Sequence, residues 1–276
     1  MNEPVSLATV VGQLESLFPP ASAAPWDAVG WVYGDPERTV GRILLAVDPT
    51  YEVADEAAAI GADLLLVHHP LFLKPVHGFT SQTPKGATLS RLIEAGCALY
   101  TAHTNADRAA GGVSDCLAAA LGLGDIRPLV ADAQDAPTGM GRIGVVDQCT
   151  LAEFAERVAR ALPGTAAGVR YAGDPSRPVR TVAVCGGAGD FLLDAVVDSD
   201  ADVFVTSDLR HHPAAEFREK RGQALIDVPH WAAEWTWLPV LAGQLRELLG
   251  DTVAVHVSER VTDPWTGHVI QMEENP

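Results

Sequence analysis

The stretch ADLLLVHHP, residues 62–70, decides the fold class of this chain. Its four consecutive apolar residues, 64–67, are typical of a strand in the middle of a parallel sheet. Side chains alternate along a strand, so His68 and His69 can face the same way only where the strand has ended, and Pro70 indicates that it has. The segment therefore predicts an α/β fold with two imidazoles at the end of a buried strand.

Two further segments also consist of an apolar strand that ends in a histidine, with a carboxylate four residues later. They are CALYTAHTNAD, residues 97–107, with His103 and Asp107, and ALIDVPHWAAE, residues 224–234, with His230 and Glu234. A spacing of four residues points both side chains the same way if the chain turns helical after the strand. Imidazoles and carboxylates that lie together at strand ends are the usual ligands of a polynuclear metal site.

The strands and helices alternate along the chain in an order that occurs twice. RILLAVD, DLLLVHH and CALYTAH in the first stretch match RTVAVCG, DVFVTSD and QALIDVPH in the second. We therefore expect two intertwined repeats of a βαβ-type unit with mixed, mostly parallel sheets, although chance similarity between βαβ units is the alternative. The expected division is a first repeat at 1–128, a linking unit at 129–178 and a second repeat at 179–276. Ligands gather at the carboxyl ends of parallel strands, which predicts the metal site in the cleft between the repeats.

Several segments outside the repeats are also assigned from the pattern. Residues 124–142 are rich in Gly, Asp and Pro and predict a loop, and one long helix is expected from the end of the 223–230 strand to about residue 249. Residues 252–258 predict a closing strand, and the glycines of CGGAGD, residues 185–190, predict a tight turn rather than a phosphate-binding loop.

Composition excludes some classes of protein. The formal net charge of −17, from 19 basic and 36 acidic residues in 276, argues against binding along a nucleic-acid backbone. The four cysteines form no CxxC pair, so a zinc ribbon or a disulfide framework is not expected. The N-terminal residues lack a basic region of the signal-peptide type, and no apolar run is long enough to cross a bilayer. We therefore expect a cytoplasmic protein with no membrane partner.

Each candidate site residue has a structural alternative. His68 and His69 would otherwise be a polar pair that ends a strand, Asp107 the N-cap of a helix starting near residue 113, and Glu234 an ordinary helix-surface residue. His103 is a ligand, an outer hydrogen-bond donor or a base that contacts substrate, and the sequence leaves these roles open. The roles of Asp208 and of His211 and His212, which repeat the HHP string in the second stretch, also stay open.

The motifs taken together resemble a known family over nearly the whole chain. They are WDAVGWVYGDP (26–36), LLLVHHPLFLKP (64–75), AHTNAD (102–107), VAVCGGAGD (182–190), VTSDLRHHP (205–213) and HWAAEW (230–235). In this order they resemble the Nif-three-like dinuclear metal-centre proteins, the GTP cyclohydrolase 1 type 2 homologues. One departure is Ala28, where the family usually has Asn. The linking segment is also too short for the domain that some members insert there.

The resemblance implies a specific site and assembly. His69 and Asp107 would bind one metal ion, His68 and His230 the other, and Glu234 would bridge the two. It also implies a homo-hexamer built as a trimer of dimers.

Five protein ligands for two ions leave coordination positions open, which is typical of a catalytic site. Without a thiolate ligand, zinc, iron, manganese, cobalt and nickel all suit the site. We expect a metal-dependent hydrolase of a small nucleotide-like or heterocyclic substrate, with a metal-bridging hydroxide as nucleophile, His103 transferring a proton and Glu234 holding both ions. The alternative is a non-catalytic metal-binding protein that regulates or binds a partner.

Overall fold

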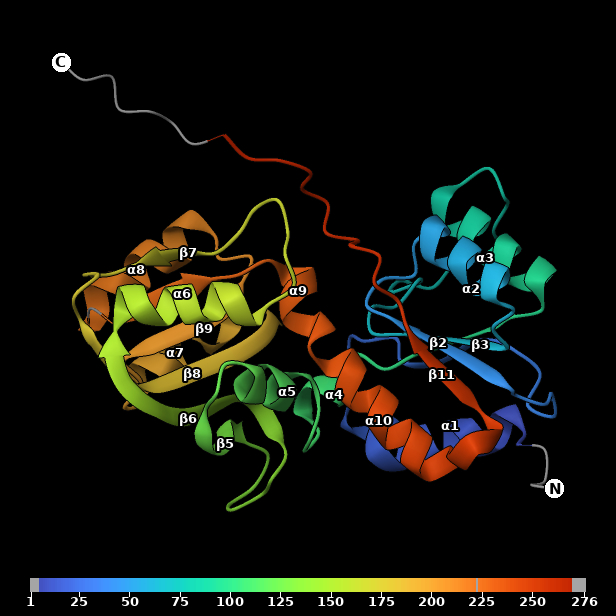
Figure 1. Ribbon diagram of the computed structural model, residues 1–276, viewed down its shortest axis with the longest axis horizontal. Coiled ribbons are helices and arrows are strands. Elements are labelled where there is room, and N and C mark those ends of the chain that lie inside the picture. The colour runs from blue at the N-terminus through green and yellow to red at the C-terminus, as the bar shows by residue number, and fades with distance from the viewer. Residues whose placement is uncertain (1–4, 222, 270–276) are drawn as a thin grey trace.

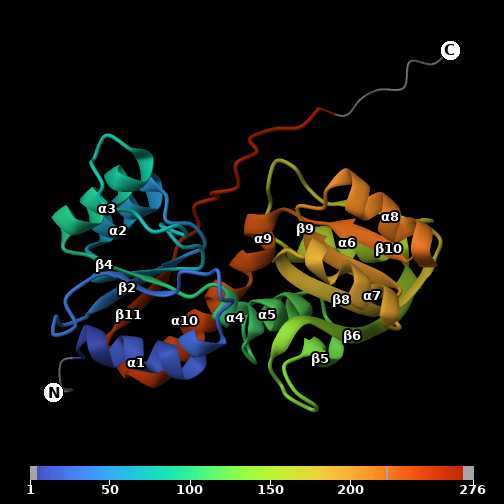
Figure 2. The same ribbon diagram turned by 180° about the vertical axis from the view of Figure 1, so that it is seen from behind.

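The computed structural model describes residues 5–221 and 223–269, and these form two sheets joined by a group of central helices (Figure 1). The first sheet has five strands in the order β1-β4-β3-β2-β11, of which only β1 is antiparallel to its neighbour. Its strands are β1 (Gly30–Tyr33), β2 (Arg42–Ala46), β3 (Leu64–Val67), β4 (Ala98–Thr101) and β11 (Ala254–Val257). Helices α2 (Tyr51–Ile60) and α3 (Pro84–Ala95) cover one face of it, and α1 (Leu7–Leu17) and α10 (Trp237–Leu249) lie on the other (Figures 1 and 2).

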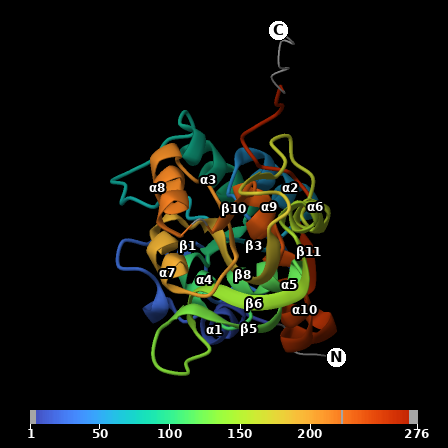
Figure 3. The same cartoon turned by 90° about the vertical axis from the view of Figure 1, so that its left-hand side faces the viewer.

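The second sheet has six strands in the order β5-β6-β8-β9-β10-β7, with β8, β9 and β10 parallel. Its strands are β5 (Gly124–Ala131), β6 (Gly139–Thr150), β7 (Arg170–Ala172), β8 (Pro178–Ala188), β9 (Val203–Ser207) and β10 (Ala224–Asp227). Figure 3 shows α7 (Leu193–Asp198) and α8 (His211–Arg221) on one side of this sheet, and α5 (Val113–Ala120) and α6 (Leu151–Ala161) on the other. The short helices α4 (Thr104–Arg108) and α9 (His230–Trp235) lie between the two sheets (Figure 1). Three 3₁₀ turns complete the described elements: η1 (Pro20–Ser22), η2 (Asp190–Leu192) and η3 (Gly250–Thr252).

One hydrophobic core runs through both halves of the molecule. Along β2, Ile43 and Leu45 face this shared core, while Leu44 faces a separate core under α2 and α3. Along β8, Val182 faces the shared core, and Ala183 faces a third core under α7 and α8. Because both faces of each sheet are covered, the central strands need apolar side chains at every position, which explains the continuous apolar runs in the sequence.

The predicted α/β class is confirmed, and the strands of the two expected repeats, β2-β3-β4 and β8-β9-β10, form matching parallel sets. The prediction of a loop at 124–142 is wrong, because β5 and β6 pair there as an antiparallel ribbon. The prediction of one long helix up to about residue 249 is also wrong, because the segment is divided at Thr236 into α9 and α10.

The strands of the expected linking unit join the second sheet, whereas β11 pairs with β2 of the first. The C-terminal part of the expected second repeat therefore crosses back to the first sheet. Within the described residues, no helix is long and apolar enough to cross a membrane. All four cysteines are free.

Arg142 of β6 ties the central helices to the second sheet. Its side chain is only 1% exposed and donates to both carboxylate oxygens of Asp115 at 2.7 and 2.9 Å. It also donates to the carbonyl oxygen of Ala109 at 2.8 Å, in the loop that follows α4. A buried guanidinium with this many acceptors fixes the position of α4 relative to the sheet.

We expect Arg142→Ala to lower the free energy of unfolding by about 3–5 kcal/mol, because it leaves Asp115 and several carbonyl groups without their donor. Arg160→Ala is the matched control. Its ion pair with Glu156 is exposed, with side chains 72% and 70% accessible, so the change should cost less than about 1 kcal/mol. Urea denaturation measures both values, and equal losses in the two variants would contradict this role for Arg142.

Candidate metal centre

His68 and His69 follow β3 directly, as the sequence predicted. Their backbone N–H groups still donate to Ala46 and Val47 beside the end of β2, at 3.2 and 2.9 Å, so the pair is held against the sheet. His68 is completely buried, and the His69 side chain is 24% exposed. Their ring centroids are 5.0 Å apart, and both rings belong to the same cluster.

His103 and Asp107 are brought together by α4, which supplies the helical turn that their four-residue spacing requires. The N–H of Asp107 donates to the carbonyl oxygen of His103 at 3.0 Å, which is the first helical turn after β4. The N-cap position of α5 is Gly112, so the alternative role of Asp107 as the cap of that helix is wrong. The Oδ1 atom of Asp107 is instead buried without a hydrogen bond.

Helix α9 presents His230 and Glu234 from the opposite half of the molecule. It starts at His230, after Pro229, so the two residues lie one turn apart, and His230 Nε2 is 2.9 Å from Glu234 Oε1. Glu234 is only 3% exposed, which excludes the alternative of an ordinary helix-surface residue.

The carboxylate of Glu234 is the point at which the halves converge. Its Oε2 atom lies 3.1 Å from His69 Nε2, and its Oε1 atom lies 3.4 Å from His68 Nε2. Asp107 Oδ1 lies 3.6 Å from the same His68 nitrogen, and the ring centroids of His68 and His103 are 5.0 Å apart. All six residues singled out in the sequence thus come together at one place.

Among the residues that the structure describes, imidazole and carboxylate atoms within 4.8 Å of one another form two overlapping groups. One is His68, His69 and His103, and the other is His69, His230 and Glu234. The resemblance pairs the ligands differently, since it joins His69 to Asp107 and His68 to His230. His211 and His212 are exposed at the start of α8 and belong to neither group.

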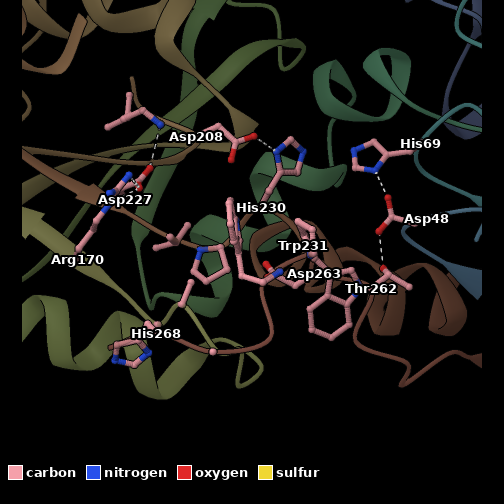
Figure 4. Close-up of a pocket in the computed structure, with 18 residues that line it drawn as sticks. Asp48, His69, Arg170, Asp208, Asp227, His230, Trp231, Thr262, Asp263 and His268 are labelled. Carbon is pink, nitrogen blue, oxygen red and sulfur yellow. Dashed lines mark hydrogen bonds and ion pairs between the residues drawn. The ribbon is translucent and has the colours of Figure 1, made fainter. Parts of the chain in front are cut away.

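Every histidine of the cluster has its Nδ1 atom engaged by an oxygen outside it. Asp48, two residues after β2, lies 2.7 Å from Nδ1 of His69, and Asp208, after β9, lies 2.7 Å from Nδ1 of His230 (Figure 4). His103 contacts Asp27 in the same way at 2.9 Å, and the carbonyl oxygen of Ala102 lies 2.9 Å from Nδ1 of His68. Such partners fix the orientation of each ring and leave the lone pair of Nε2 available to bind a metal ion.

These outer carboxylates were not assigned by sequence reasoning. Asp48 and Asp208 each end a predicted strand, RILLAVD and DVFVTSD, and Asp27 is part of the WDAVGWVYGDP motif. The sequence therefore did contain a signal for two of these residues. Asp48 and Asp208 each end a predicted strand that neighbours a strand ending in histidine. Asp208 adopts a left-handed backbone with φ of 56°, which aspartate tolerates better than most residues.

The electrostatics of the cluster follow from burying carboxylates beside imidazoles. Burial alone would lower the pKa of His69 and of His230, but Glu234, with Asp48 and Asp208 respectively, outweighs it and raises these pKa values to about 10 and about 11. Burial would raise the pKa of Glu234, yet the neighbouring imidazoles hold it well below the usual range. For Asp107 burial prevails and raises the pKa. The cluster therefore needs positive charge, which either protons or metal ions can supply.

Three buried atoms in the cluster have no hydrogen-bond partner, and they show whether these residues suit a metal ion. His68 Nε2, Asp107 Oδ1 and Glu234 Oε2 are enclosed and lack hydrogen bonds. Leaving such atoms unsatisfied costs about 1–3 kcal/mol each. All three face the same cluster, and imidazole nitrogen with carboxylate oxygen is a donor set for zinc, iron, manganese, cobalt or nickel. The residues fit a divalent metal.

Two glycines of β8 make room for the cluster. A methyl group added at Gly187 would lie 2.5 Å from Glu234 Oε1 and 3.1 Å from His230 Nε2, and its φ is 68°. At Gly186, such a group would lie 2.6 Å from Cγ1 of Val113. The CGGAGD segment is thus the end of a strand with a bulge rather than the tight turn expected. Gly187 allows α9 to approach, and Gly186 makes room for Val113 of α5.

We expect Gly187→Ala to lower the free energy of unfolding by about 1–3 kcal/mol, because it combines a left-handed backbone with a clash against Glu234. Gly243→Ala in α10 is the control, since its added methyl meets nothing within 4 Å and should stabilise the helix by up to about 1 kcal/mol. Urea denaturation of both variants tests this, and a Gly187→Ala protein as stable as the parent would contradict it.

A cavity of about 680 Å³ adjoins the outer edge of the cluster (Figure 4). It touches the cluster only at His69 and His230, and its wall carries the carboxylates of Asp48, Asp208, Asp227 and Asp263. The C-terminal segment closes one side of it, where Thr262 donates a hydrogen bond to Asp48. We refer to it as the acidic cavity.

Comparison with known proteins agrees with this architecture. A Streptomyces coelicolor protein named GTP cyclohydrolase 1 type 2 homolog is 49% identical over 269 residues, covering 95% of this chain and 94% of the relative. A Mycobacterium leprae protein of the same name is 36% identical, covering 94% of each chain. That alignment extends over 366 residues, so the relative has insertions.

Among solved structures, a Bacillus cereus protein related to NIF3 matches with a TM-score of 0.87 at 24% identity, covering 96% of this chain and 99% of that one, which bears on the fold alone. A Staphylococcus aureus hypothetical protein matches with a TM-score of 0.86 at 27% identity, with the same coverage. The model of the Duf34/NIF3 (NGG1p interacting factor 3) family matches residues 5–264. The resemblance seen in the sequence motifs is therefore confirmed, and this chain belongs to the Duf34/NIF3 family.

Proposed function

We propose that the cluster binds two divalent metal ions through His68, His69, Asp107, His230 and Glu234, with Glu234 shared between them. The observation that carries this proposal is the buried Glu234 carboxylate, whose oxygens lie 2.9–3.4 Å from three imidazole nitrogens. The three enclosed donor atoms without hydrogen bonds support it, since each is an electron-pair donor in need of a cation. We propose the homo-hexamer only on the strength of the family resemblance.

We further propose that the protein is a metal-dependent hydrolase of a small nucleotide-like or heterocyclic compound. Divalent ions at such a site lower the pKa of water and polarise the bond that is attacked. His103 is the residue to move the proton: it is 16% exposed, and Asp27 accepts from its Nδ1 and so leaves Nε2 free to receive one. The pKa of Asp27 is lowered against the effect of burial by His103 and Thr104, so it stays an acceptor.

Metal content is the first test. Reconstituted protein should hold about two ions per chain by elemental analysis, and Glu234→Ala should lose both, because one carboxylate serves the two. His69→Ala and Asp107→Ala should each weaken one ion selectively. Asp227→Asn is a control, because Asp227 lines the acidic cavity but lies outside the cluster, and its metal content should not change. Protein that takes up no metal after careful reconstitution would rule the proposal out.

Activity is the second test, by a broad hydrolase screen that includes GTP with the Glu234→Ala variant as blank. Turnover should vanish with chelator, return with added divalent metal, and fall steeply, by about 100-fold or more, in His68→Ala. His103→Ala should retain its metal and lose roughly 100- to 10,000-fold in rate, the contribution typical of general acid–base catalysis. Loss of metal from His103→Ala would make it a ligand instead. If no compound turns over above the blank, the non-catalytic metal-binding function becomes the better account.

A further inference from the structure

A second cavity, of about 460 Å³, opens directly onto the cluster. Its wall includes His103, Asp107, His230 and Glu234, so it reaches the carboxylates of the proposed centre, whereas the acidic cavity reaches only His69 and His230. The remaining wall is largely apolar. We refer to it as the aromatic cavity, and its volume lies within the range of about 300–1,000 Å³ usual for small-molecule sites.

Two large aromatic side chains line the aromatic cavity without packing into a hydrophobic core of the described residues. Trp26 is 61% exposed and Phe191 is 58% exposed, and neither belongs to a hydrophobic core. The Trp26 ring lies edge-on to His103, with centroids 5.9 Å apart. Phe191 lies in the η2 turn that follows β8. Exposed aromatic surface that borders a polar cluster is typical of a ligand site, and π-faces favour a planar ring.

The charges around the two cavities differ in a way that selects the ligand. Arg108 is the one Lys or Arg side chain in the described wall of the aromatic cavity. It forms an ion pair with Asp132, which holds it in place. The described wall of the aromatic cavity has two carboxylates, Asp107 and Glu234, both in the proposed metal centre. The acidic cavity presents four carboxylates and a single arginine, Arg170, whose Nε is 2.6 Å from an oxygen of Asp227. On a chain with a net charge of −17, an anionic group meets the least repulsion beside Arg108.

We propose that the aromatic cavity binds a planar heteroaromatic ring that carries an anionic substituent. The ring packs on Trp26 and Phe191 with one edge toward Glu234 and His103, and the anionic group lies toward Arg108. This assignment rests on the proposed function, because it takes the cluster as the reacting centre, and it names the substrate class and the side from which substrate enters.

The test uses the full-length, metal-loaded protein and nucleoside monophosphates as probes. GMP, AMP, UMP and CMP supply a planar ring with an anion, guanosine supplies a ring alone, and ribose 5-phosphate supplies an anion alone. Equilibrium dialysis should detect binding of at least one monophosphate. Trp26→Ala and Phe191→Ala should each weaken it at least about fivefold, the effect of losing a base–aromatic stacking contact.

The matched control is Trp265→Ala, which removes an aromatic side chain that is 68% exposed and lines the acidic cavity. It should change the affinity less than about twofold. Arg108→Gln should weaken the monophosphate and leave guanosine unchanged, and ribose 5-phosphate should bind far more weakly than the monophosphate. The three aromatic side chains are exposed and the Arg108 side chain is 30% exposed. Circular dichroism checks that each variant is folded.

Three results would overturn the assignment. Binding that is sensitive to Trp265→Ala but not to Trp26→Ala would move the ligand to the acidic cavity. A metal-loaded protein that binds none of the four monophosphates would exclude this ligand class. A change of particle mass by light scattering in Trp26→Ala or Phe191→Ala, with affinity unchanged, would make these side chains a subunit contact.

The metal content of every sample is measured in parallel, so that failure of the metal proposal is seen separately. If the parent protein takes up no metal but still binds a monophosphate through Trp26, the metal proposal fails and the ring site stands.

Discussion

The structure depends on the buried carboxylate of Glu234, which must be matched by positive charge from both halves of the molecule. Taking a carboxylate out of water costs several kcal/mol unless it is paired and hydrogen-bonded. Here the partners are His68 and His69 from the first sheet and His230 from its own helix. Protons on these imidazoles can supply the charge, as the raised pKa values of His69 and His230 indicate, and divalent ions can replace those protons. The same constraint would link folding of the two halves to the proposed metal binding.

The fold supplies this arrangement with two sets of parallel strands. Parallel strands bring their carboxyl ends to one edge, and two such sets, β2-β3-β4 and β8-β9-β10, turn those edges toward a common centre. Around that centre Asp48 and Asp208, which follow β2 and β9, and Asp27, which precedes β1, orient the histidines. Because Gly187 has no side chain, α9 can approach closely enough for Glu234 to reach all three imidazoles.

The sequence was informative wherever the signal was local. Continuous apolar runs predicted the central strands, and the four-residue spacing of His103 with Asp107 and of His230 with Glu234 predicted side chains on one face. Their convergence was predicted only through the repeat and the resemblance, since long-range contacts leave no local pattern. The β5–β6 ribbon was missed because its Gly, Asp and Pro residues indicate loops, and pairing between strands overrides that preference. The return of β11 to the first sheet was likewise beyond a local pattern.

The most direct test of the central claim is crystallographic anomalous scattering, recorded above and below the absorption edge of the bound metal. We expect two peaks in each chain, one on either side of the Glu234 carboxylate, with Nε2 atoms of His68, His69 and His230 as neighbours. A single peak that Glu234 does not contact, or metal bound only at exposed histidines such as His211 and His212, would contradict the account.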